Sequence, residues 1–404
     1  MNSNWKECKL GDVVDIVPGY AFKSEHFGEI GQSVVKITNI NPPYINVDGA
    51  KKVDLAFYNI EKLKNYFLRP NEFAVAMTGA TIGKVGKNIS NETVILNQRV
   101  AKISPLNSVD HHFIYYCIQG NDFQEFIQNN IDSHSAQENI SGTSIARFPI
   151  LLPPLPEQRA IAGVLGSLDD KIDLLHRQNK TLEGMAEALW RKMFVPACAG
   201  DPHADREEAD PNWKKGKLGN IAEINPLRSI KKRAIAIYLD MSNMPTNGPF
   251  PKEWIKREFT SGMKFKNGDT VIARITPCLE NGKTAYVNFL NNEEIAWGST
   301  EYIVLAPKTG YHSEWYYFLA RNDDFRDFAI QNMTGTSGRQ RVSGESVAQY
   351  EITIPPSKYM EQFGEFAMPV MEHIKHNSFQ IRSLSRLRDT LLPKLMSGEL
   401  RVPI

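Results

Sequence analysis

The chain carries the same sequence pattern twice, 202 positions apart. SGTSIARFPILLPP at Ser141–Pro154 recurs as SGESVAQYEITIPP at Ser343–Pro356. The beginning of the chain is repeated too, because the WKECKLG that starts at Trp5 returns as the WKKGKLG that starts at Trp213. Solenoid repeats are only about 20–50 residues long, so this period predicts a duplicated domain with a further segment after each copy. Two similar binding units on one chain imply a partner with two sites, or two partners.

A long helix is predicted after the first Pro-Pro pair. Beyond Pro156 there is no proline up to Phe194, and apolar or small residues recur at alternating steps of four and three, broken only at Asn179. This spacing is typical of a coiled-coil seam, and a proline fits the first turn of a helix. The expected seam positions are Ile161, Leu165, Leu168, Ile172, Leu175, Leu182 and Leu189 in the first copy, and Ile374, Ile381, Leu384, Leu391 and Leu395 in the second.

The second copy of this helix is less regular. Either Leu387 or Arg388 fills one seam position, and Pro369 and Pro393 should bend or end the helix locally. A seam this narrow suits a helix partner better than a broad globular core, and the natural partner is the other long helix. The alternative is that each helix packs on its own unit.

The rest of each copy is expected to be mixed and mostly β. Short β-branched runs bounded by Gly, Asn or Pro predict strands, and aromatic residues at helical spacing predict one helix per unit. The expected strands are Val34–Ile37, Phe73–Met77, Val100–Ile103, Asp269–Ala273 and Tyr302–Leu305, and the expected helices are Phe113–Ile127 and Glu314–Ile330.

The fold class is therefore α+β, with two mostly β domains joined by two long helices. If the copies are related by a pseudo-twofold axis, these helices form an antiparallel coiled coil. The expected boundaries are a first domain at 1–155, a long helix at 156–194, an exposed linker at 195–211, a second domain at 212–357, and a final helix and tail at 358–404.

Composition excludes several classes. Cys8, Cys117, Cys198 and Cys278 show no CxxC spacing, which argues against a zinc site or a disulfide framework and favours a reducing cytoplasm. No apolar run is long enough for a signal peptide or for the ~18 residues of a membrane span. The net charge is only +1, so a nucleic-acid binder would have to concentrate its basic residues locally.

Motifs for catalysis are absent or incomplete. Asn41–Tyr44 spells NPPY, the loop that grips the target amino group in amino-methylating enzymes, but no cofactor-binding fingerprint accompanies it. We interpret it as a plain turn. The stretches 79–85 and 277–284 imitate phosphate loops without completing the motif, since the first is one residue short and the second has Pro277 in place of the first glycine. We interpret both as hairpin turns with a lysine nearby. No GxSxG elbow or HExxH pair occurs, so catalytic and metal residues are expected to be none.

A binding signature remains. Basic and amide side chains gather in turn-rich stretches of both copies, and these side chains hydrogen-bond base edges and hold phosphates. The candidate DNA-binding residues are Lys36, Thr38, Asn39, Lys84, Asn97, Gln98 and Arg99 in the first copy, and Arg228, Lys231, Lys232, Arg233, Arg274, Lys283, Arg339, Gln340 and Arg341 in the second.

The chain resembles the specificity subunit of Type I restriction–modification systems. The resemblance is carried by the stretch SGTSIARFPILLPPLPEQRAIAGVLGSLDDKIDLL that starts at Ser141, TGATIGKVG at Thr78–Gly86, LNQRV at Leu96–Val100, and SLSRLRDTLLPKLMSGELRV at Ser383–Val402. It extends over essentially the whole chain. The second copy keeps neither TGATIGKVG nor LNQRV, so the two domains should recognise different half-sites.

This resemblance implies a protein without catalytic activity of its own. Two target-recognition domains would each read half of a split double-stranded DNA target in a prokaryotic cytoplasm, and the two antiparallel helices would set their spacing. Two methyltransferase subunits would bring S-adenosylmethionine, and restriction subunits would bring ATP and Mg²⁺, so this chain would bind no cofactor. The open alternatives are a self-contained adenine-N6 DNA methyltransferase that uses NPPY, and a protein scaffold without DNA contact.

Overall fold

The computed structural model describes residues 5–131, 138–195, 212–336 and 338–403. The chain forms two compact units, the first of Met1–Asp170 with Leu384–Ile404, and the second of Lys171–Ser383. Apart from Val195, the expected linker at 195–211 lies outside the described residues, as does Cys198.

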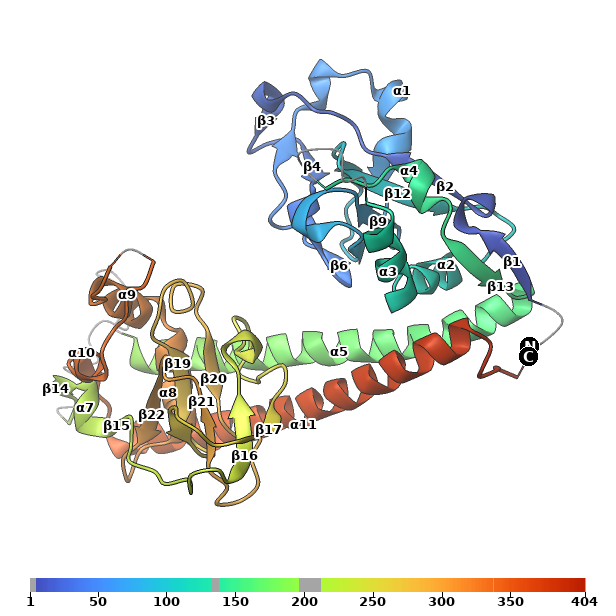
Figure 1. Ribbon diagram of the computed structural model, residues 1–404. Helices are drawn as coiled ribbons and strands as arrows, with labels where there is room; N and C mark the ends of the chain where they lie inside the picture. The colour runs from blue at the N-terminus through green and yellow to red at the C-terminus, as the bar shows by residue number, and fades with distance from the viewer. Residues whose placement is uncertain (1–4, 132–137, 196–211, 337, 404) are drawn as a thin grey trace. The chain divides into compact units, whose positions relative to one another are not determined.

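Two mixed sheets form most of the first unit (Figure 1). Their strands are β2 (Val14–Pro18), β3 (Phe27–Gly28), β4 (Gln32–Val35), β5 (Ile40–Asn41), β6 (Tyr44–Ile45), β7 (Lys52–Val53), β8 (Phe67–Leu68), β9 (Phe73–Ala76), β10 (Val85–Lys87), β11 (Val94–Leu96) and β12 (Val100–Pro105). The strand orders are β2-β12-β9-β10-β6-β5 and β3-β7-β4-β11-β8. The strands predicted around Val34, Phe73 and Val100 are thus confirmed as β4, β9 and β12.

The second unit repeats this plan with fewer strands. They are β15 (Ala222–Ile224), β16 (Ile235–Leu239), β17 (Ile255–Glu258), β18 (Lys264–Phe265), β19 (Thr270–Ala273), β20 (Thr284–Tyr286), β21 (Ala296–Gly298) and β22 (Tyr302–Pro307). The orders are β15-β22-β19-β20 and β17-β16-β21-β18. The units share a parallel pair, β4 with β11 and β16 with β21, and a hairpin that connects β9 to β10 or β19 to β20. The first unit has a further parallel pair, β6 with β10.

The most strongly repeated sequence forms the junction between each domain and its long helix. Strand β1 (Lys6–Lys9) pairs with β13 (Pro149–Leu152), and β14 (Lys214–Lys217) pairs with β23 (Glu351–Ile354). A Cβ added at Gly11 would lie 2.8 Å from the Cβ of Ala146, and at Gly219 it would lie 3.2 Å from that of Ala348. Glycine and alanine therefore recur here because the chain segments approach too closely for larger side chains.

Serine starts the short helix of each junction. Ser141 caps α4 (Gly142–Ile145), and Ser343 caps α10 (Gly344–Ala348), each by accepting a hydrogen bond from the backbone N–H three residues later. A serine N-cap stabilises a helix by about 1 kcal/mol. The repeated SGxS motif is thus a structural signal, present in both copies because both need the same junction.

The prediction of one helix per unit is wrong, because each predicted stretch forms two short helices. We call these two helices the helical layer of the unit. The first unit has α2 (His111–Cys117) and α3 (Asn121–Asn129), and the second has α8 (Ser313–Arg321) and α9 (Asp323–Gln331). Between α8 and α9, Asn322 has extended backbone angles, and its side chain accepts hydrogen bonds from the first turn of α9. The aromatic periodicity continues across this break, which is why the sequence pattern concealed it. Shorter helices are α1 (Ile60–Leu63) and α7 (Leu218–Ile221).

Two helices of 40 residues each, α5 (Leu155–Phe194) and α11 (Ser357–Met396), cross the boundary between the units. At 1.5 Å per residue each is about 60 Å long. The expectation that Pro369 and Pro393 could end α11 is wrong, because the helix continues through both. Proline removes one hydrogen bond, but Pro369 is exposed while Phe363 and Ile374 on either side are buried in the core of the second unit.

The two long helices pair in an antiparallel manner within each unit. In the first unit Glu157 near the start of α5 binds Arg401, which follows α11, and Asp169 further along α5 binds Arg388 within α11. The residue numbers rise along α5 while those of their partners fall, so the two helices run in opposite directions. In the second unit Asn179 binds Asn377, and the ring of Phe194 lies 5.5 Å from that of Phe363.

The seam follows the predicted positions closely. Ile161, Leu165, Ile172, Leu175, Ile374 and Leu395 are buried, and Leu168, Leu182, Leu189, Ile381, Leu384 and Leu391 are half-buried. The seam position for which the sequence allowed either Leu387 or Arg388 is occupied by Arg388, which pairs with Asp169, whereas Leu387 is 47% exposed. The long helices pair with each other and also pack on the units, because Ile161 and Leu165 belong to the core of the first unit. Both predicted packing modes, helix on helix and helix on its own unit, therefore hold in part.

Asn179, which interrupts the seam, belongs to a polar pair inside the second unit. Asn377 donates to its Oδ1 at 2.9 Å, and its own amide donates to the Ser378 hydroxyl at 3.3 Å. Asn377 is only 3% exposed. A buried amide pair of this kind favours one register of two helices over shifted ones, because any shift leaves the amides without partners.

We expect Asn377→Leu to lower the melting temperature by several degrees. The substitution removes the donor from the Asn179 carbonyl, and an unsatisfied buried acceptor costs about 1–3 kcal/mol. The double variant Asn179→Leu/Asn377→Leu should recover most of the loss, because two apolar groups can replace a buried polar pair. Scanning calorimetry measures both, with the exposed neighbour Lys180→Ala as control. A single variant as stable as the parent would contradict this role.

Candidate nucleic-acid interface

Three loops of the first unit meet at one place. They are the β9–β10 connection at 77–84, the β11–β12 turn at 97–99, and the segment 138–140 that precedes α4. The Met77 N–H donates to the carbonyl of Arg99 at 2.9 Å, and the Ile140 N–H donates to the carbonyl of Met77 at 3.0 Å. Met77 and Ile140 are buried, so these bonds hold the loops together from beneath, while Lys84, Gln98, Arg99 and Asn139 are exposed.

The second unit builds the same frame from different residues. The Arg274 N–H donates to the carbonyl of Glu301 at 3.0 Å, and the Val342 N–H donates to the carbonyl of Arg274 at 3.0 Å. The loops are 274–283, 299–301 and 334–342, of which residue 337 lies outside the described part. Ile275 also forms an isolated bridge with Arg341, as Thr78 does with Asn139. The backbone frame is therefore duplicated, bond for bond.

Matched positions in this frame carry opposed or unrelated side chains. The pairs, first unit named first, are Met77 with Arg274, Arg99 with Glu301, and Asn139 with Arg341. The difference between the two copies is therefore concentrated in the side chains that the shared frame presents.

Glu301 organises the loop cluster of the second unit. Its carboxylate accepts hydrogen bonds from Arg341, at 2.8 Å and 2.9 Å from Nε and 2.8 Å from Nη2, and lies 3.6 Å from the Nε of Arg274. The hydrogen bonds from Arg341 hold the pKa of the Glu301 carboxyl below its usual value, and the same contact raises the pKa of Arg341. The carboxylate thus stays charged and holds both guanidinium groups in fixed positions.

The structure brings the candidates of the first unit together. Lys84, Gln98, Arg99 and Thr38 are exposed on the loop cluster or beside it. Segment 36–39 lies against this cluster, since a Cβ added at Gly79 would be 3.6 Å from the side chain of Ile37.

Three further candidates of the first unit are partly or fully buried. The Nζ of Lys36 lies 4.0 Å from the centre of the Phe27 ring, and burial followed by repulsion from Lys51 lowers its pKa. Asn97 is half-buried in the turn. Asn39 is corrected to a structural residue, because it is buried, accepts from the Lys36 N–H and donates to the carbonyl of Asn46.

In the second unit the candidates lie at three separate places. Arg274, Lys283, Arg339, Gln340 and Arg341 lie on the loop cluster. The Nζ of Lys283 is engaged, because it donates to the carbonyl of Met241 at 2.7 Å. Arg228 lies elsewhere and is also corrected to a structural residue, because its side chain is 9% exposed and pairs with the buried carboxylate of Asp269.

Lys231, Lys232 and Arg233 form a separate basic turn at the end of the β16–β17 ladder. Arg233 donates from its N–H to the carbonyl of Phe259, and all three side chains are exposed. On the adjoining sheet face, the guanidinium of Arg257 lies 4.9 Å from the ring centre of Tyr238 and 5.8 Å from that of Trp297. Contacts between arginine and aromatic rings occur in many folded proteins, and at nucleic-acid surfaces both kinds of side chain can stack on bases.

The catalytic imitations are turns, as interpreted. Asn41 and Tyr44 of NPPY are cross-strand partners that close the β5–β6 hairpin. The carbonyl of Pro43 in this hairpin accepts from the Lys87 N–H and the Tyr115 hydroxyl. Both phosphate-loop imitations connect antiparallel strands. Within the described ranges, no three His, Cys, Asp or Glu side chains gather as a metal site requires, and no helix is long and apolar enough to span a membrane.

Sequence reasoning missed Glu301, Asn139 and Arg257. Glu301 and Asn139 were missed because only basic and amide residues near obvious turns were collected in each copy separately. Superposing the copies at the 202-residue period would have placed Glu301 opposite Arg99 and Arg341 opposite Asn139. Arg257 gave no signal, since its place depends on the pairing of β17 with β16.

The loop clusters have the chemistry to recognise base edges. Arginine donates two parallel hydrogen bonds to guanine, asparagine and glutamine pair with adenine, and a carboxylate accepts from the cytosine amino group. Backbone contacts to phosphate need only lysine or arginine. Each unit therefore presents side chains of kinds that are able to read bases, and the two sets differ.

Comparison with known proteins agrees with this chemistry. The family model of the Type I restriction modification DNA specificity domain matches residues 2–184 and 211–372. The Type I restriction enzyme MjaIX specificity subunit of Methanocaldococcus jannaschii is 24% identical over 345 residues, which are 80% of this chain and 76% of the relative. The EcoBI specificity subunit of Escherichia coli is 27% identical over 232 residues, 56% of this chain and 45% of the relative.

A solved structure shares the fold. The crystal structure of the S subunit of a Type I restriction–modification system from M. genitalium matches with a TM-score of 0.60 at 15% identity, over 98% of this chain and 97% of that chain. The two ranges of the family model together cover most of the sequence and coincide with its two copies. The chain therefore belongs to the family of Type I restriction–modification DNA specificity subunits.

Proposed function

We propose that this chain reads a split DNA target for a Type I restriction–modification complex, with one half-site for each unit. The observation that carries the proposal is the duplicated hydrogen-bonded frame that presents Arg99 and Asn139 in one unit and Glu301 and Arg341 in the other. A shared frame supports the same mode of docking on a duplex, and different side chains support different base sequences. A target with two unlike halves fits this combination.

In this proposal the chain recognises DNA and its partners perform the chemistry. Two methyltransferase subunits with S-adenosylmethionine would dock on it, and restriction subunits with ATP and Mg²⁺ would join them. The net charge of +1 fits a subunit whose partners share the phosphate contacts, since the phosphate backbone normally dominates affinity. In this proposal the NPPY loop takes no part, because Asn41 and Tyr44 close a hairpin and the sequence carries no cofactor-binding fingerprint.

The long helices would act as the spacer. Half-sites on one face of DNA lie about one helical turn, ~34 Å, apart, and a helix is the stiffest element with which a single chain can keep such a distance. Continuous helices of 40 residues support this role, as does the amide pair that favours one register.

Changing the length of these helices should change the spacer of the target and leave both half-sites unaltered. Four residues are inserted in α5 between Leu165 and Leu189, with and without a matching insertion in α11 between Ile374 and Leu391. The methylome of the host reports the motif. The same insertion after the exposed Asn107, outside the helices, should leave the spacer unchanged. An unaltered spacer in the helix variants would exclude the spacer role.

Removing a loop arginine should relax one half-site only. Arg99→Ala and Arg341→Ala each remove a group that can read a base, and one good bidentate contact contributes about 1–3 kcal/mol to discrimination. Binding of DNA by the chain with its methyltransferase partner is measured on targets with single-base changes in either half. Lys215→Ala, an exposed lysine outside the loop clusters, should keep both preferences. Equal loss on all sequences from the arginine variants would indicate phosphate contacts instead.

A further inference from the structure

One glycine in each loop cluster is held in a conformation that its surroundings must maintain. Gly83 and Gly282 have φ angles of +79° and +68°, in the left-handed region that favours glycine. Each precedes the loop lysine, Lys84 or Lys283, whose carbonyl closes the hairpin by accepting from the last residue of β9 or β19. The two glycines are therefore equivalent, although the loops differ in length.

In the first unit, helix α3 holds this glycine from behind. The Gln124 side chain donates from Nε2 to the carbonyl of Gly83 at 2.7 Å. A Cβ on Gly83 would lie 2.9 Å from the side chain of Ile127, one turn further along the helix, which is fully buried. The helix thus presses directly on the loop, and Gln124 makes the polar contact.

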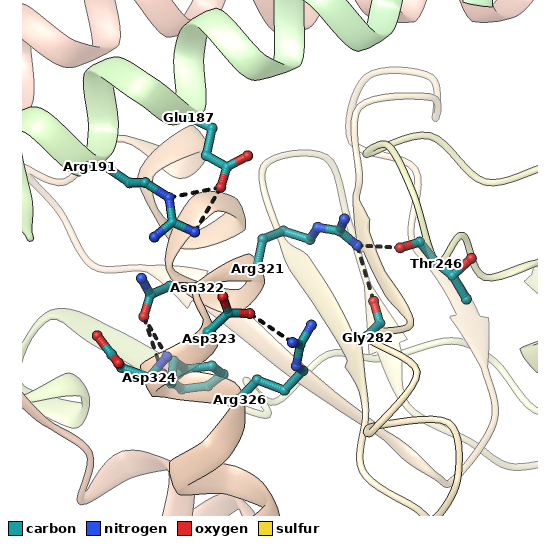
Figure 2. A network of polar contacts seen from close by, with 10 residues as sticks. Glu187, Arg191, Thr246, Gly282, Arg321, Asn322, Asp323, Asp324 and Arg326 are labelled. Carbon is teal, nitrogen blue, oxygen red and sulfur yellow. Dashed lines mark hydrogen bonds and ion pairs between the residues drawn. The ribbon is translucent and has the colours of Figure 1, made fainter. Parts of the chain in front are cut away.

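In the second unit an arginine from a different helix does the same. Arg321, the last residue of α8, donates from Nη1 to the carbonyl of Gly282 at 3.3 Å and to that of Thr246 at 2.6 Å, as Figure 2 shows. Arg326, which stands 202 positions after Gln124, instead pairs with Asp323 at 2.7 Å. The contact is therefore kept while the residue that makes it has changed.

Arg321 also joins one loop of the cluster to a neighbouring segment of the chain. Thr246 belongs to the segment that follows β16, and this segment runs beside β20, since the Thr284 N–H donates to the carbonyl of Pro245 at 3.1 Å. One guanidinium thus bonds to both the 241–250 segment and the 274–283 loop (Figure 2).

We propose that Gln124 and Arg321 are positioning residues for DNA recognition, each holding the glycine carbonyl of the loop in its own unit and thereby setting specificity at one half-site. The inference rests on the proposed function and adds the residues that keep its reading groups in place. Base-reading donors must be held within about 0.5 Å of their productive positions, and a loop turned by a left-handed glycine depends on outside contacts for that precision. Loss of the anchor leaves the reading side chains intact but poorly placed.

The test uses the full chain in complex with its methyltransferase subunits. Methylation rates are measured on duplexes that carry the target, or the target with single-base changes in either half. Gln124→Ala should reduce discrimination about tenfold at the half-site read by the first unit and leave the other half-site unchanged. Arg321→Ala should produce the mirror result. The untouched half-site shows in each case that the chain is folded.

Conservative substitutions separate the hydrogen bond from packing. Gln124→Glu keeps the size but offers a carboxylate that cannot donate, so it should behave like Gln124→Ala. Arg321→Lys keeps one donor and should restore part of the discrimination. Gln128→Ala on α3 and Asp327→Ala on α9 remove exposed side chains and should have no effect on either half-site.

The outcomes distinguish the two levels of the proposal. A parent complex that discriminates at neither half-site overturns the proposed function and this inference with it. A parent that discriminates at both, with Gln124→Ala and Arg321→Ala that still do so, overturns the inference alone. Equal loss at both half-sites also overturns it, because it would mark a general effect on folding or on partner docking.

Discussion

Each unit depends on the long helix that follows the other copy of the repeat. Ala186 and Trp190 of α5 are buried in the core of the second unit, and Leu395 of α11 is buried in the core of the first. Because burial of apolar surface is the main favourable term in folding, neither domain core is complete without the antiparallel pairing of these helices. The pairing is therefore a requirement of folding as well as a candidate spacer.

In each unit, hydrogen bonds connect the helical layer to α5 and to the loop cluster. The Tyr116 hydroxyl in α2 donates to Asp169 of α5 at 2.7 Å in the first unit, and Tyr317 in α8 donates to Glu183 of α5 in the second. Burial is the main cause that raises the pKa of both tyrosines, which keeps the hydroxyls protonated as donors. On the other side of this layer, Gln124 and Arg321 hold the loop glycines. In each unit, hydrogen bonds thus connect α5 to the helical layer and the helical layer to a loop glycine.

The sequence was most informative where local pattern and tertiary role coincide. The 202-residue repeat, the seam of α5 and the short strands were all predictable, because hydrophobic periodicity reflects which face is buried. Pattern failed where tertiary packing overrides a local rule. Pro369 was expected to bend or end α11, yet α11 continues through it, with buried neighbours on either side. In the helical layer, the aromatic periodicity of α8 and α9 concealed the break at Asn322.

The candidate site divides along the same line. Residue chemistry selected Arg99 and Arg341, which lie on the loop clusters, but it also selected Arg228, which the structure pairs with a buried carboxylate. Composition alone cannot separate an arginine that neutralises an internal charge from one that faces a ligand. That distinction depends on burial, and burial of a polar side chain is decided by which other segments fold against it.

By itself, the sequence determined that the chain has two equivalent domains, that a long helix follows each, and that the stretches between the shared motifs differ. Those properties are written in local spacing and in comparison of the chain with itself. Only the tertiary structure decided that Met77 and Arg274, which the 202-residue period does not align, occupy matched places, because their N–H groups donate to the equivalent carbonyls of Arg99 and Glu301. These bonds join segments distant in the chain, and no local pattern encodes their partners.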